Sequence, residues 1–149
     1  NSIIPSVQPT HATSDMRWAV LRIGRQRLKY GYAYKMLLEQ NGLVALGTDF
    51  PVENISPIET FYAAVARKDK SGSTEEGFQL ENALTRMEAL QGMTIWAAMS
   101  NFEENEKGTL EAGKSADMVI LNQNLLTIPQ KQILKTRVTA TFVNGKKVY

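Results

Sequence analysis

A short, uninterrupted apolar run, Leu43-Val44-Ala45-Leu46, constrains the fold of this chain more than any other segment. Glycines stand on both sides of the run, Gly42 before it and Gly47 after it. A run this short, bounded by residues that turn the chain, is typical of a strand buried on both faces, as in parallel sheets covered by helices. The sequence therefore predicts an α/β fold in which this run is a buried strand.

The residues that follow the run carry functional groups. Gly47 allows a tight turn, and the hydroxyl of Thr48 and the carboxylate of Asp49 come next. In α/β barrels the carboxyl ends of the strands carry the chemistry, because the loops after the strands meet there. Asp49 is therefore a candidate catalytic residue. The alternative is that Asp49 only caps a turn or the next helix, as aspartate often does.

Composition excludes several classes of function. The chain has 149 residues, 43% of them hydrophobic, which allows one ordinary domain or part of a larger one. A net charge of +2, from 17 basic and 15 acidic residues, disfavours a nucleic-acid partner. There is no cysteine, which excludes disulfides and thiolate sites, and one histidine, His11, cannot form a multi-histidine metal site. No apolar run approaches the length of about 18 residues that a membrane span needs.

The first third of the chain predicts a βα repeat. Residues 2–8 form a short apolar strand that ends at Pro9, so that His11 lies just beyond the strand end. Ser14 and Asp15 are predicted N-caps of a helix that breaks at Gly24. The basic residues after the break are expected to face solvent. A second helix is expected over residues 33–40, with Met36 and Leu37 facing inward, and then the buried strand.

The middle of the chain predicts helices. Ser56-Pro57-Ile58-Glu59 is a capping box with proline at the first helical position, which indicates a helix to about Arg67. Residues 68–77 are polar and are expected to form an exposed loop. Apolar residues then recur at helical spacing over residues 80–90, and Thr94 is the expected cap of a further short helix. The methionines and Trp96 are expected in the core.

The last part of the chain predicts antiparallel strands. Met118-Val119-Ile120-Leu121 is a strong strand pattern, and residues 137–143 are rich in β-branched side chains. Asn144-Gly145 is the preferred two-residue hairpin turn, after which residues 146–149 return as a strand. The change from a βα body to a β tail predicts two structural layers. Since the chain begins at Asn1 and residues 2–7 already have a strand pattern, we expect that it begins in the middle of a fold.

Three motifs together resemble a known family. They are Gln8-Pro9-Thr10-His11, Gly47-Thr48-Asp49-Phe50-Pro51-Val52 and Gly108-Thr109-Leu110-Glu111-Ala112-Gly113-Lys114-Ser115-Ala116-Asp117. In this order the chain resembles the C-terminal portion of a metal-dependent amidohydrolase, in the branch of N-substituted formamide deformylase-like proteins. The resemblance implies the C-terminal part of a (β/α)8 barrel plus strands of a small β-sandwich. Residues 1–104 would hold the last two βα units, and residues 105–149 the sandwich strands.

The resemblance also implies residue roles. Asp49 corresponds to the family's strand-eight aspartate, which ligates a divalent metal, typically zinc, and accepts a proton from the metal-activated water. His11 follows the family's seventh strand, where either a substrate contact or a structural hydrogen bond is expected. Thr48 could support Asp49, although a turn role is favoured. Arg67 could contact a substrate anion, although the helix dipole already explains a cation there. Gly113 and Lys114 are expected to shape a turn without a catalytic role.

The implied function is hydrolysis of carbon–nitrogen bonds in small amide-type molecules. The family's other metal ligands would lie upstream of Asn1, so the chain alone is expected to be inactive and to self-associate through unpaired strand edges. The compartment stays open, with the cytoplasm favoured, because an upstream segment could carry a leader. One alternative is a non-catalytic α/β module whose β tail mediates assembly. A flavodoxin-like binding domain is a third reading, disfavoured because no glycine loop cradles phosphate.

Overall fold

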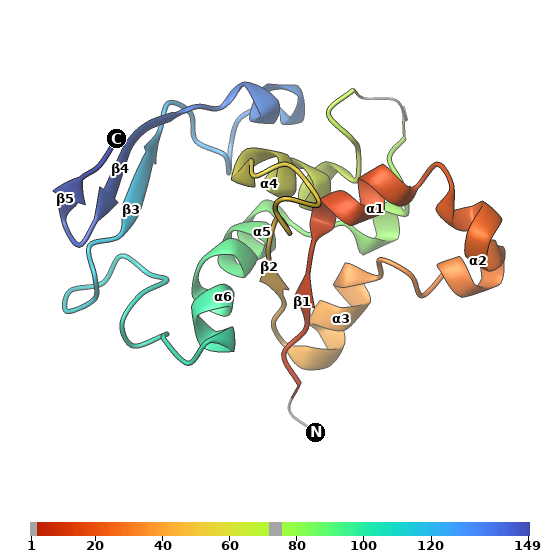
Figure 1. Cartoon of the computed structure of the whole chain (residues 1–149), viewed down its shortest axis with the longest axis horizontal. Helices are drawn as coiled ribbons and strands as arrows, with labels where there is room; N and C mark the ends of the chain where they lie inside the picture. Colours follow the sequence, from red (N-terminus) through yellow and green to blue (C-terminus); the bar gives the residue numbers. More distant parts are fainter. Residues whose placement is uncertain (1–2, 72–75) are drawn as a thin grey trace.

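Two short parallel strands lie at the centre of the body in the computed structural model, which describes residues 3–71 and 76–149. Strand β1 (Ser6–Val7) pairs with β2 (Ala45–Leu46), with Ser6 opposite Ala45 and Val7 opposite Leu46 (Figure 1). The strands run in the same direction and end at the same level. The predicted βα arrangement is therefore confirmed, with strands shorter than the sequence patterns indicate.

Helices lie around this strand pair, except for the second one along the chain, which is set apart at the right of the view (Figure 1). They are α1 (Pro9–Asp15), α2 (Ala19–Leu28), α3 (Tyr34–Asn41), α4 (Pro57–Ala66), the 3-10 helix η1 (Leu80–Asn82), α5 (Arg86–Met93) and α6 (Ile95–Ser100). Helix α1 packs against α4, and α5 and α6 both pack on β2. None of the helices in the described part of the chain combines the length and the apolar character of a membrane span.

Local signals begin and end several helices as predicted. The Ser56 hydroxyl accepts the Glu59 N–H at 3.3 Å at the start of α4. Gly42 ends α3 in the left-handed conformation, with φ of 79°, which glycine adopts without the steric cost of a Cβ. Gly92 lets α5 lie directly on β2, because a Cβ on Gly92 would stand 2.6 Å from Cγ of Leu46.

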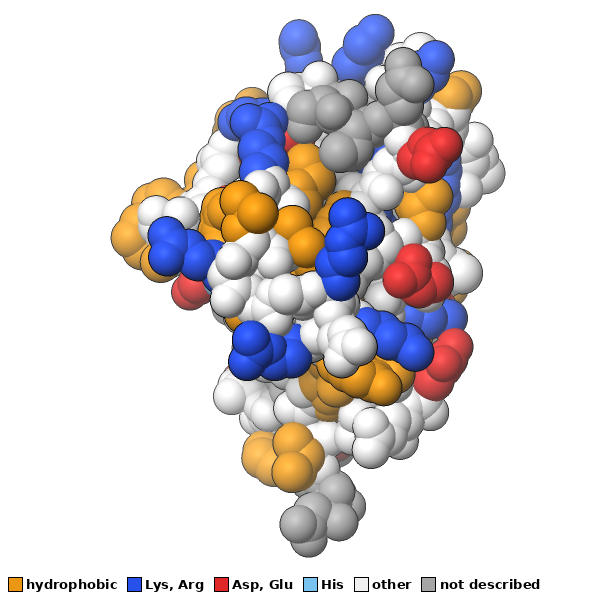
Figure 2. Space-filling view, turned by 90° about the vertical axis from the view of Figure 1, so that its right-hand side faces the viewer, with side chains coloured by type: hydrophobic (Ala, Val, Ile, Leu, Met, Phe, Trp, Pro, Cys, Tyr) orange, Lys and Arg blue, Asp and Glu red, His pale blue; other side chains and the backbone are white. Residues whose placement is uncertain are grey.

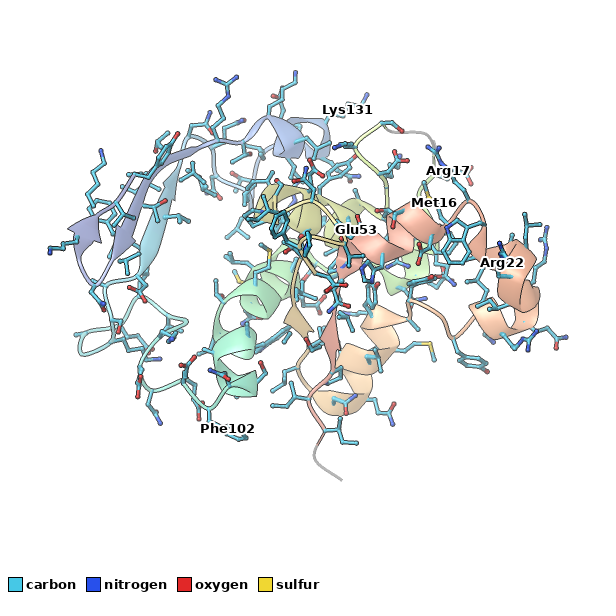
Figure 3. The ribbon with its side chains drawn as sticks, in the orientation of Figure 1. Met16, Arg17, Arg22, Glu53, Phe102 and Lys131 are labelled. Carbon is cyan, nitrogen blue, oxygen red and sulfur yellow. The ribbon has the colours of Figure 1, made fainter. Side chains whose placement is uncertain are left out.

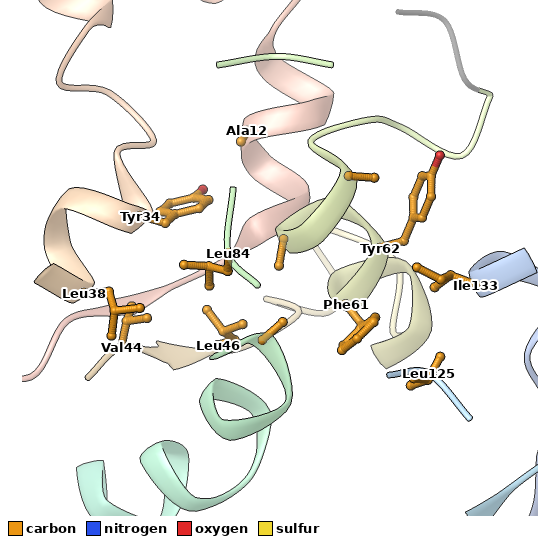
Figure 4. Close-up of a cluster of buried hydrophobic side chains, with 13 residues drawn as sticks. Ala12, Tyr34, Leu38, Val44, Leu46, Phe61, Tyr62, Leu84, Leu125 and Ile133 are labelled. Carbon is orange, nitrogen blue, oxygen red and sulfur yellow. The ribbon is translucent and has the colours of Figure 1, made fainter. Parts of the chain in front are cut away.

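The hydrophobic core lies between the strands and the helices (Figure 4). Val44 and Leu46 contribute from the β2 region, and Phe61 of α4 is 1% exposed. Leu125 and Ile133, from the C-terminal part of the chain, close the same cluster beside Phe61. Full burial of a side chain of this size stabilises the fold by about 1.5–3 kcal/mol, so the core is the main source of stability.

The C-terminal part forms a separate antiparallel sheet in the order β3-β4-β5. Its strands are β3 (Met118–Leu121), β4 (Val138–Val143) and β5 (Lys146–Lys147), and the 3-10 helix η2 (Gln130–Lys135) precedes β4. Asn144 and Gly145 have φ of 48° and 74°, as a type I′ turn requires. The predicted hairpin is confirmed.

Several helix predictions were wrong in detail. Ser14 and Asp15 are not N-caps, because α1 already begins at Pro9, whose fixed φ suits the first helical position. The predicted break at Gly24 is present, since its φ of 75° and ψ of 157° interrupt α2. The helix expected over residues 80–90 is split, because Ala83 is extended between η1 and α5. Thr94 does not cap α6 with its side chain, which instead donates to the Leu90 carbonyl at 2.7 Å.

Burial also corrects the sequence analysis. Met36 and Met87 are 44% and 50% exposed, so these two methionines are not core residues. Trp96 packs against the core while remaining partly exposed. Figure 2 views the side that carries α2 and shows Lys and Arg side chains spread over it. Arg25, Arg27 and Lys29 are exposed there, as predicted. Of the predicted loop over residues 68–77, residues 72–75 lie outside the described part.

Candidate active site

The two predicted site residues lie next to each other. The Ala45 N–H donates to the Pro5 carbonyl, and the Gly47 N–H donates to the Val7 carbonyl at 3.0 Å, so the ends of β1 and β2 are held at one level. The chain then enters α1 immediately after β1, and His11 lies in the first turn of that helix. Asp49 follows β2. Parallel pairing therefore brings the two residues to the same edge of the sheet.

His11 Nε2 stands 3.3 Å from Asp49 Oδ2. The His11 side chain is 28% exposed and the Asp49 carboxylate is 47% exposed. The distance permits an ion pair, but Nε2 does not point at the carboxylate with hydrogen-bond geometry. Among the described residues this nitrogen is shielded from solvent and has no hydrogen-bond partner. A shielded nitrogen without a partner beside an open carboxylate suits a pair that shares a third group.

The loop after β2 presents Asp49 without using its carboxylate. Asp49 has a left-handed backbone, with φ of 57°, and its carbonyl accepts the Val52 N–H at 2.8 Å. The Thr48 hydroxyl accepts the Phe50 N–H at 3.3 Å, which is the turn role expected of it. Ser56, not Asp49, caps the next helix. The helix-capping alternative for Asp49 is therefore wrong, and its carboxylate makes no hydrogen bond to backbone within the described residues.

A polar contact and two hollows lie near the pair, although Asp49 lines neither hollow. The Ser14 hydroxyl donates to Glu53 Oε1 at 2.6 Å, which ties α1 to the loop after Asp49. Figure 3 shows Glu53 beside α1. His11 itself lines a hollow of about 470 Å³ between β1, α1 and α3. A second hollow, of about 520 Å³, lies over Ser14, Glu53 and the start of α4. Both volumes suit small molecules.

The described residues do not form a complete metal centre. No cluster of three or more histidine, cysteine, aspartate or glutamate side chains in residues 3–71 and 76–149 could hold a metal ion. Asp49 offers carboxylate oxygens, and the neighbouring His11 offers one imidazole nitrogen. A catalytic zinc normally takes three protein ligands and keeps one open position. This part of the chain can thus contribute to such a centre but cannot complete it.

Arg67 is far more buried than the helix-dipole explanation implies. It is 0% exposed and has a left-handed backbone, with φ of 53°, just after α4. Its Nε donates to the Phe78 carbonyl at 2.9 Å, and its Nη2 donates to the Tyr32 carbonyl at 3.2 Å. Burial lowers the pKa of Arg67 to about 10, so the guanidinium stays charged at neutral pH. Its bonds show a structural role inside the molecule.

Two tyrosines that the sequence analysis did not single out hold α1. The Tyr34 hydroxyl donates to the Gln8 carbonyl at 2.9 Å, and the Tyr32 hydroxyl donates to Asp15 Oδ2 at 2.7 Å. Burial raises the pKa of Tyr34 to about 12. Burial, and then the bond to Asp15, raise the pKa of Tyr32 well above its ordinary value. The alternation of Tyr30, Tyr32 and Tyr34 was the available sequence signal.

Comparisons with known proteins agree on one family. The sequence model of the amidohydrolase family matches residues 2–149. This chain belongs to the amidohydrolase family. The fold of a metal-dependent hydrolase of uncharacterised function from Pyrococcus horikoshii OT3 superimposes with a TM-score of 0.73 at 31% identity, over 87% of this chain and 26% of that chain.

Two curated relatives are longer than the segment that this chain matches. Protein LONG AFTER FAR-RED 3 from Arabidopsis thaliana is 34% identical over 99% of this chain and 25% of its own length. N-substituted formamide deformylase from Arthrobacter pascens is 30% identical over 76% of this chain and 20% of its own length. The chain therefore spans about a quarter or less of these relatives. The predicted resemblance to metal-dependent amidohydrolases is confirmed, as is the α/β fold class.

The third amidohydrolase motif has a structural role in this chain. Gly113 has φ of 95° in the turn that the motif forms, as predicted for a glycine there. The Lys114 ammonium donates to the Thr109 hydroxyl at 2.7 Å and pairs with Glu111. Asp117 Oδ1 accepts the N–H of Asn144, which ties the motif to the β4–β5 hairpin. These contacts connect the motif to the C-terminal sheet.

Proposed function

We propose that this chain is the part of a metal-dependent amidohydrolase that supplies Asp49 and His11 to the active site. The reaction is hydrolysis of a carbon–nitrogen bond in a small, non-peptide amide. The observation that carries the proposal is the 3.3 Å separation of His11 Nε2 and Asp49 Oδ2 at the ends of two parallel strands. Family membership supports a hydrolytic reaction, and the pair supplies groups that the proposed reaction needs.

The Asp49 carboxylate is proposed to hold a divalent metal, with zinc the favoured ion. When bound, such an ion lowers the pKa of a coordinated water from 15.7 to about 7. Asp49 accepts the proton of the attacking water and delivers it to the leaving nitrogen. This transfer requires a carboxylate that solvent and substrate can reach. Its 47% exposure agrees with that role. His11 is proposed to contact the substrate.

The remaining metal ligands are proposed to lie in other parts of the longer protein. Asp49 and His11 are too few for a catalytic zinc among the residues that the structure describes. We therefore propose that the chain alone is inactive. Residues 1–104 would complete the last two βα units of a (β/α)8 barrel, and residues 105–149 would add strands to a companion β-sandwich.

The proposed substrates are small amides, with N-substituted formamides tested first. This choice follows the name of the Arthrobacter relative, which matches 76% of this chain. The hollow of about 470 Å³ that His11 lines has room for molecules of that size. No nucleic acid or membrane is part of the proposal.

The experiment uses the longer protein that contains this chain. Its metal content is measured, and hydrolysis of a panel of N-substituted formamides and other small amides is followed with and without a chelator. Asp49→Asn is expected to lower kcat by about 10²–10⁴-fold, the usual contribution of a general base. His11→Ala is expected to raise KM. Glu39→Gln, an exposed carboxylate of α3, is the matched control and should change neither constant.

Two results would overturn the proposal. One is a protein that hydrolyses no amide in the panel although it is folded and loaded with metal. The other is an Asp49→Asn variant with the activity of the parent. Bound metal that is lost in Asp49→Asn while Glu39→Gln retains it would support the ligand role of Asp49 separately from its role as a base.

A second candidate function is assembly through the C-terminal sheet. Val119 and Ile120 are neighbours on β3 that point to opposite faces, yet they are 56% and 49% exposed. Val148 and Tyr149, at the C-terminus, are also exposed. A sheet with apolar groups open on both faces favours self-association. Sedimentation of the isolated chain tests this, and a monomer at high concentration would contradict it.

A further inference from the structure

Helix α1, which carries His11, is held at both ends by hydroxyl groups from one neighbouring segment. The Tyr34 hydroxyl donates to the carbonyl of Gln8, the residue that precedes the first turn, at 2.9 Å. The Tyr32 hydroxyl donates to Oδ2 of Asp15, the last residue of the helix, at 2.7 Å. A helix of seven residues has little stability of its own, so its position depends on such external contacts.

Arg67 in turn holds the tyrosine segment. Its Nη2 donates to the Tyr32 carbonyl at 3.2 Å, and its guanidinium carbon lies 5.0 Å from the centre of the Tyr34 ring. The same guanidinium donates through Nε to the Phe78 carbonyl and lies 5.7 Å from the Phe78 ring. One buried side chain thus connects the end of α4 to both tyrosines and to residue 78.

The chemistry of Arg67 points to placement of its neighbours rather than to a simple gain in stability. The guanidinium is fully buried, its partners among the described residues are neutral carbonyl and amide oxygens, and its Nη1 has no partner there. A buried charge without a directly paired carboxylate is costly, even though the more distant charge of Glu81 favours the guanidinium. A left-handed backbone at a residue other than glycine is costly too. The planar guanidinium holds its donors at fixed angles, so it can bind several segments at once and fix their relative positions.

Gln79 extends the same connection. Its Oε1 accepts from Arg67 Nη2 at 3.2 Å, and its Nε2 donates to the Leu28 carbonyl at 2.7 Å. Leu28 ends α2, so the segment that leads into Tyr32 is held from both sides. The tyrosine rings cannot shift relative to α4 without breaking several of these bonds together.

We propose that Tyr32, Tyr34 and Arg67 form a positioning clamp that holds α1 so that His11 faces Asp49. The three side chains touch neither His11 nor Asp49 by any hydrogen bond or ion pair within the described residues, so they act through the helix. The clamp fixes the two ends of α1, and the 3.3 Å approach of His11 to Asp49 follows from that placement. The inference rests on the proposed function for its purpose, although its geometry does not.

The test uses the 149-residue chain itself, called the parent here, in which His11 is the only histidine. Histidine labelled with ¹³C at Cε1 gives one imidazole NMR signal, and Asp49→Asn is introduced into the parent chain and into Tyr32→Phe/Tyr34→Phe. In the parent, Asp49→Asn is expected to shift the His11 signal, because the neighbouring charge is removed. In the double phenylalanine variant, this response is expected to be lost. The signal reports the contact and needs neither metal nor substrate.

Tyr30→Phe is the matched control. Tyr30 precedes the two clamp tyrosines in the same alternation, is 68% exposed, and has no hydrogen bond to α1 among the described residues. In Tyr30→Phe, the response of the His11 signal to Asp49→Asn is expected to equal that in the parent. Arg67→Lys, which keeps the charge but lacks the fork, is expected to lose the response as the double variant does. Circular dichroism checks that each variant is folded. If the double variant is unfolded, the single variant Tyr34→Phe decides the test.

Two outcomes overturn the clamp. One is a His11 signal that responds to Asp49→Asn equally in the parent and in the folded tyrosine variants. The other is a parent chain in which the signal does not respond at all. Failure of the proposed hydrolysis is a separate result, because it is measured on substrate turnover in the longer protein and leaves the imidazole signal unaffected.

Discussion

The two sheets of this molecule are made of similar residues but differ sharply in coverage. In the body, Ala45 and Leu46 of β2 are 5% and 8% exposed, because α5 and α6 pack on them. In the tail, Val119 and Ile120 of β3 are about half exposed on opposite faces. Strand-forming residues therefore do not by themselves make a buried sheet. In the body, helices of the same chain cover the sheet, whereas the tail sheet has faces that no other part of the described chain covers.

The tail is joined to the body mainly by its connecting segments, and among its strands β3 contributes Leu121, which packs against the core. Ile133 of η2 is 0% exposed and, with Leu125, packs into the core beside Phe61. The Arg86 guanidinium of α5 donates to the Leu125 carbonyl at 2.7 Å. The stability of the tail is thus expected to depend on these few contacts, and the sheet beyond them contributes little.

Two phenylalanines give the largest test of this comparison. Phe61→Ala in the body is expected to lower the free energy of unfolding by about 3–5 kcal/mol, because it leaves a cavity in a close-packed core. Phe142→Ala in β4, where the ring is only partly buried, is expected to cost less than about 2 kcal/mol. Urea denaturation followed by fluorescence measures both. Equal losses would contradict the distinction between body and tail.

Two isoleucines within the tail sharpen the comparison. Ile133→Ala removes a fully buried anchor and is expected to cost about 2–5 kcal/mol. Ile120→Ala removes a half-exposed side chain from β3 and is expected to cost about 1 kcal/mol or less. Denaturation of both variants in one series is the measurement. If Ile120→Ala is the more damaging change, the sheet rather than η2 attaches the tail.

Local sequence signals predicted much of this fold. The glycine-bounded run gave a buried strand, the Ser56-Pro57 pair gave the start of α4, and Asn144-Gly145 gave the hairpin. Each of these depends on residues that are close in sequence. The start of α1 was misjudged because Ser14 and Asp15 are good caps in isolation, while Pro9 directly after the strand begins the helix first.

In the candidate site, too, local sequence predicts which residues are involved but not how they are arranged. His11 and Asp49 could be selected because each follows a predicted strand. That their side chains approach to 3.3 Å depends on the strand register and on the placement of α1, and no short stretch encodes either. The local sequence indicates only that Arg67 stands at the end of a helix. It does not show that the side chain is buried, because that burial depends on Tyr32 and Phe78, which lie in other segments.

Two glycines separate tight packing from backbone strain. Gly92→Ala is expected to cost about 1–3 kcal/mol, because the new Cβ would meet Leu46 at 2.6 Å and the Val44 carbonyl at 3.0 Å. Gly113→Ala in the tail meets nothing within 4 Å, so only its φ of 95° opposes the change, at about 1 kcal/mol. Thermal unfolding compares them. Leu46→Ala is expected to recover part of the stability lost in Gly92→Ala and none of that lost in Gly113→Ala. Recovered stability in Gly113→Ala would count against this explanation.

The smallest expected difference concerns acid sensitivity. Partial burial alone would raise the pKa of Glu88, but bonds from the Lys35 ammonium, at 2.5 Å, and from the Thr85 N–H outweigh it and hold the pKa below its ordinary value of 4.5. Because the folded pKa is depressed, the stabilisation is present above pH 4.5 and is lost as the pH falls through the folded pKa. Glu88→Gln is therefore expected to cost about 1 kcal/mol at neutral pH and nothing in strong acid.

Glu111 is the matched carboxylate of the tail. The Thr109 hydroxyl, and then Lys114, lower its pKa as well, but its side chain is 66% exposed to solvent. Solvent screens such surface contacts, so Glu111→Gln is expected to leave the pH dependence of unfolding unchanged. Urea denaturation of both variants between acid and neutral pH makes the comparison. A pH dependence altered as much by Glu111→Gln as by Glu88→Gln would mean that the tail sheet shares the electrostatic stability of the body, against the division drawn from burial.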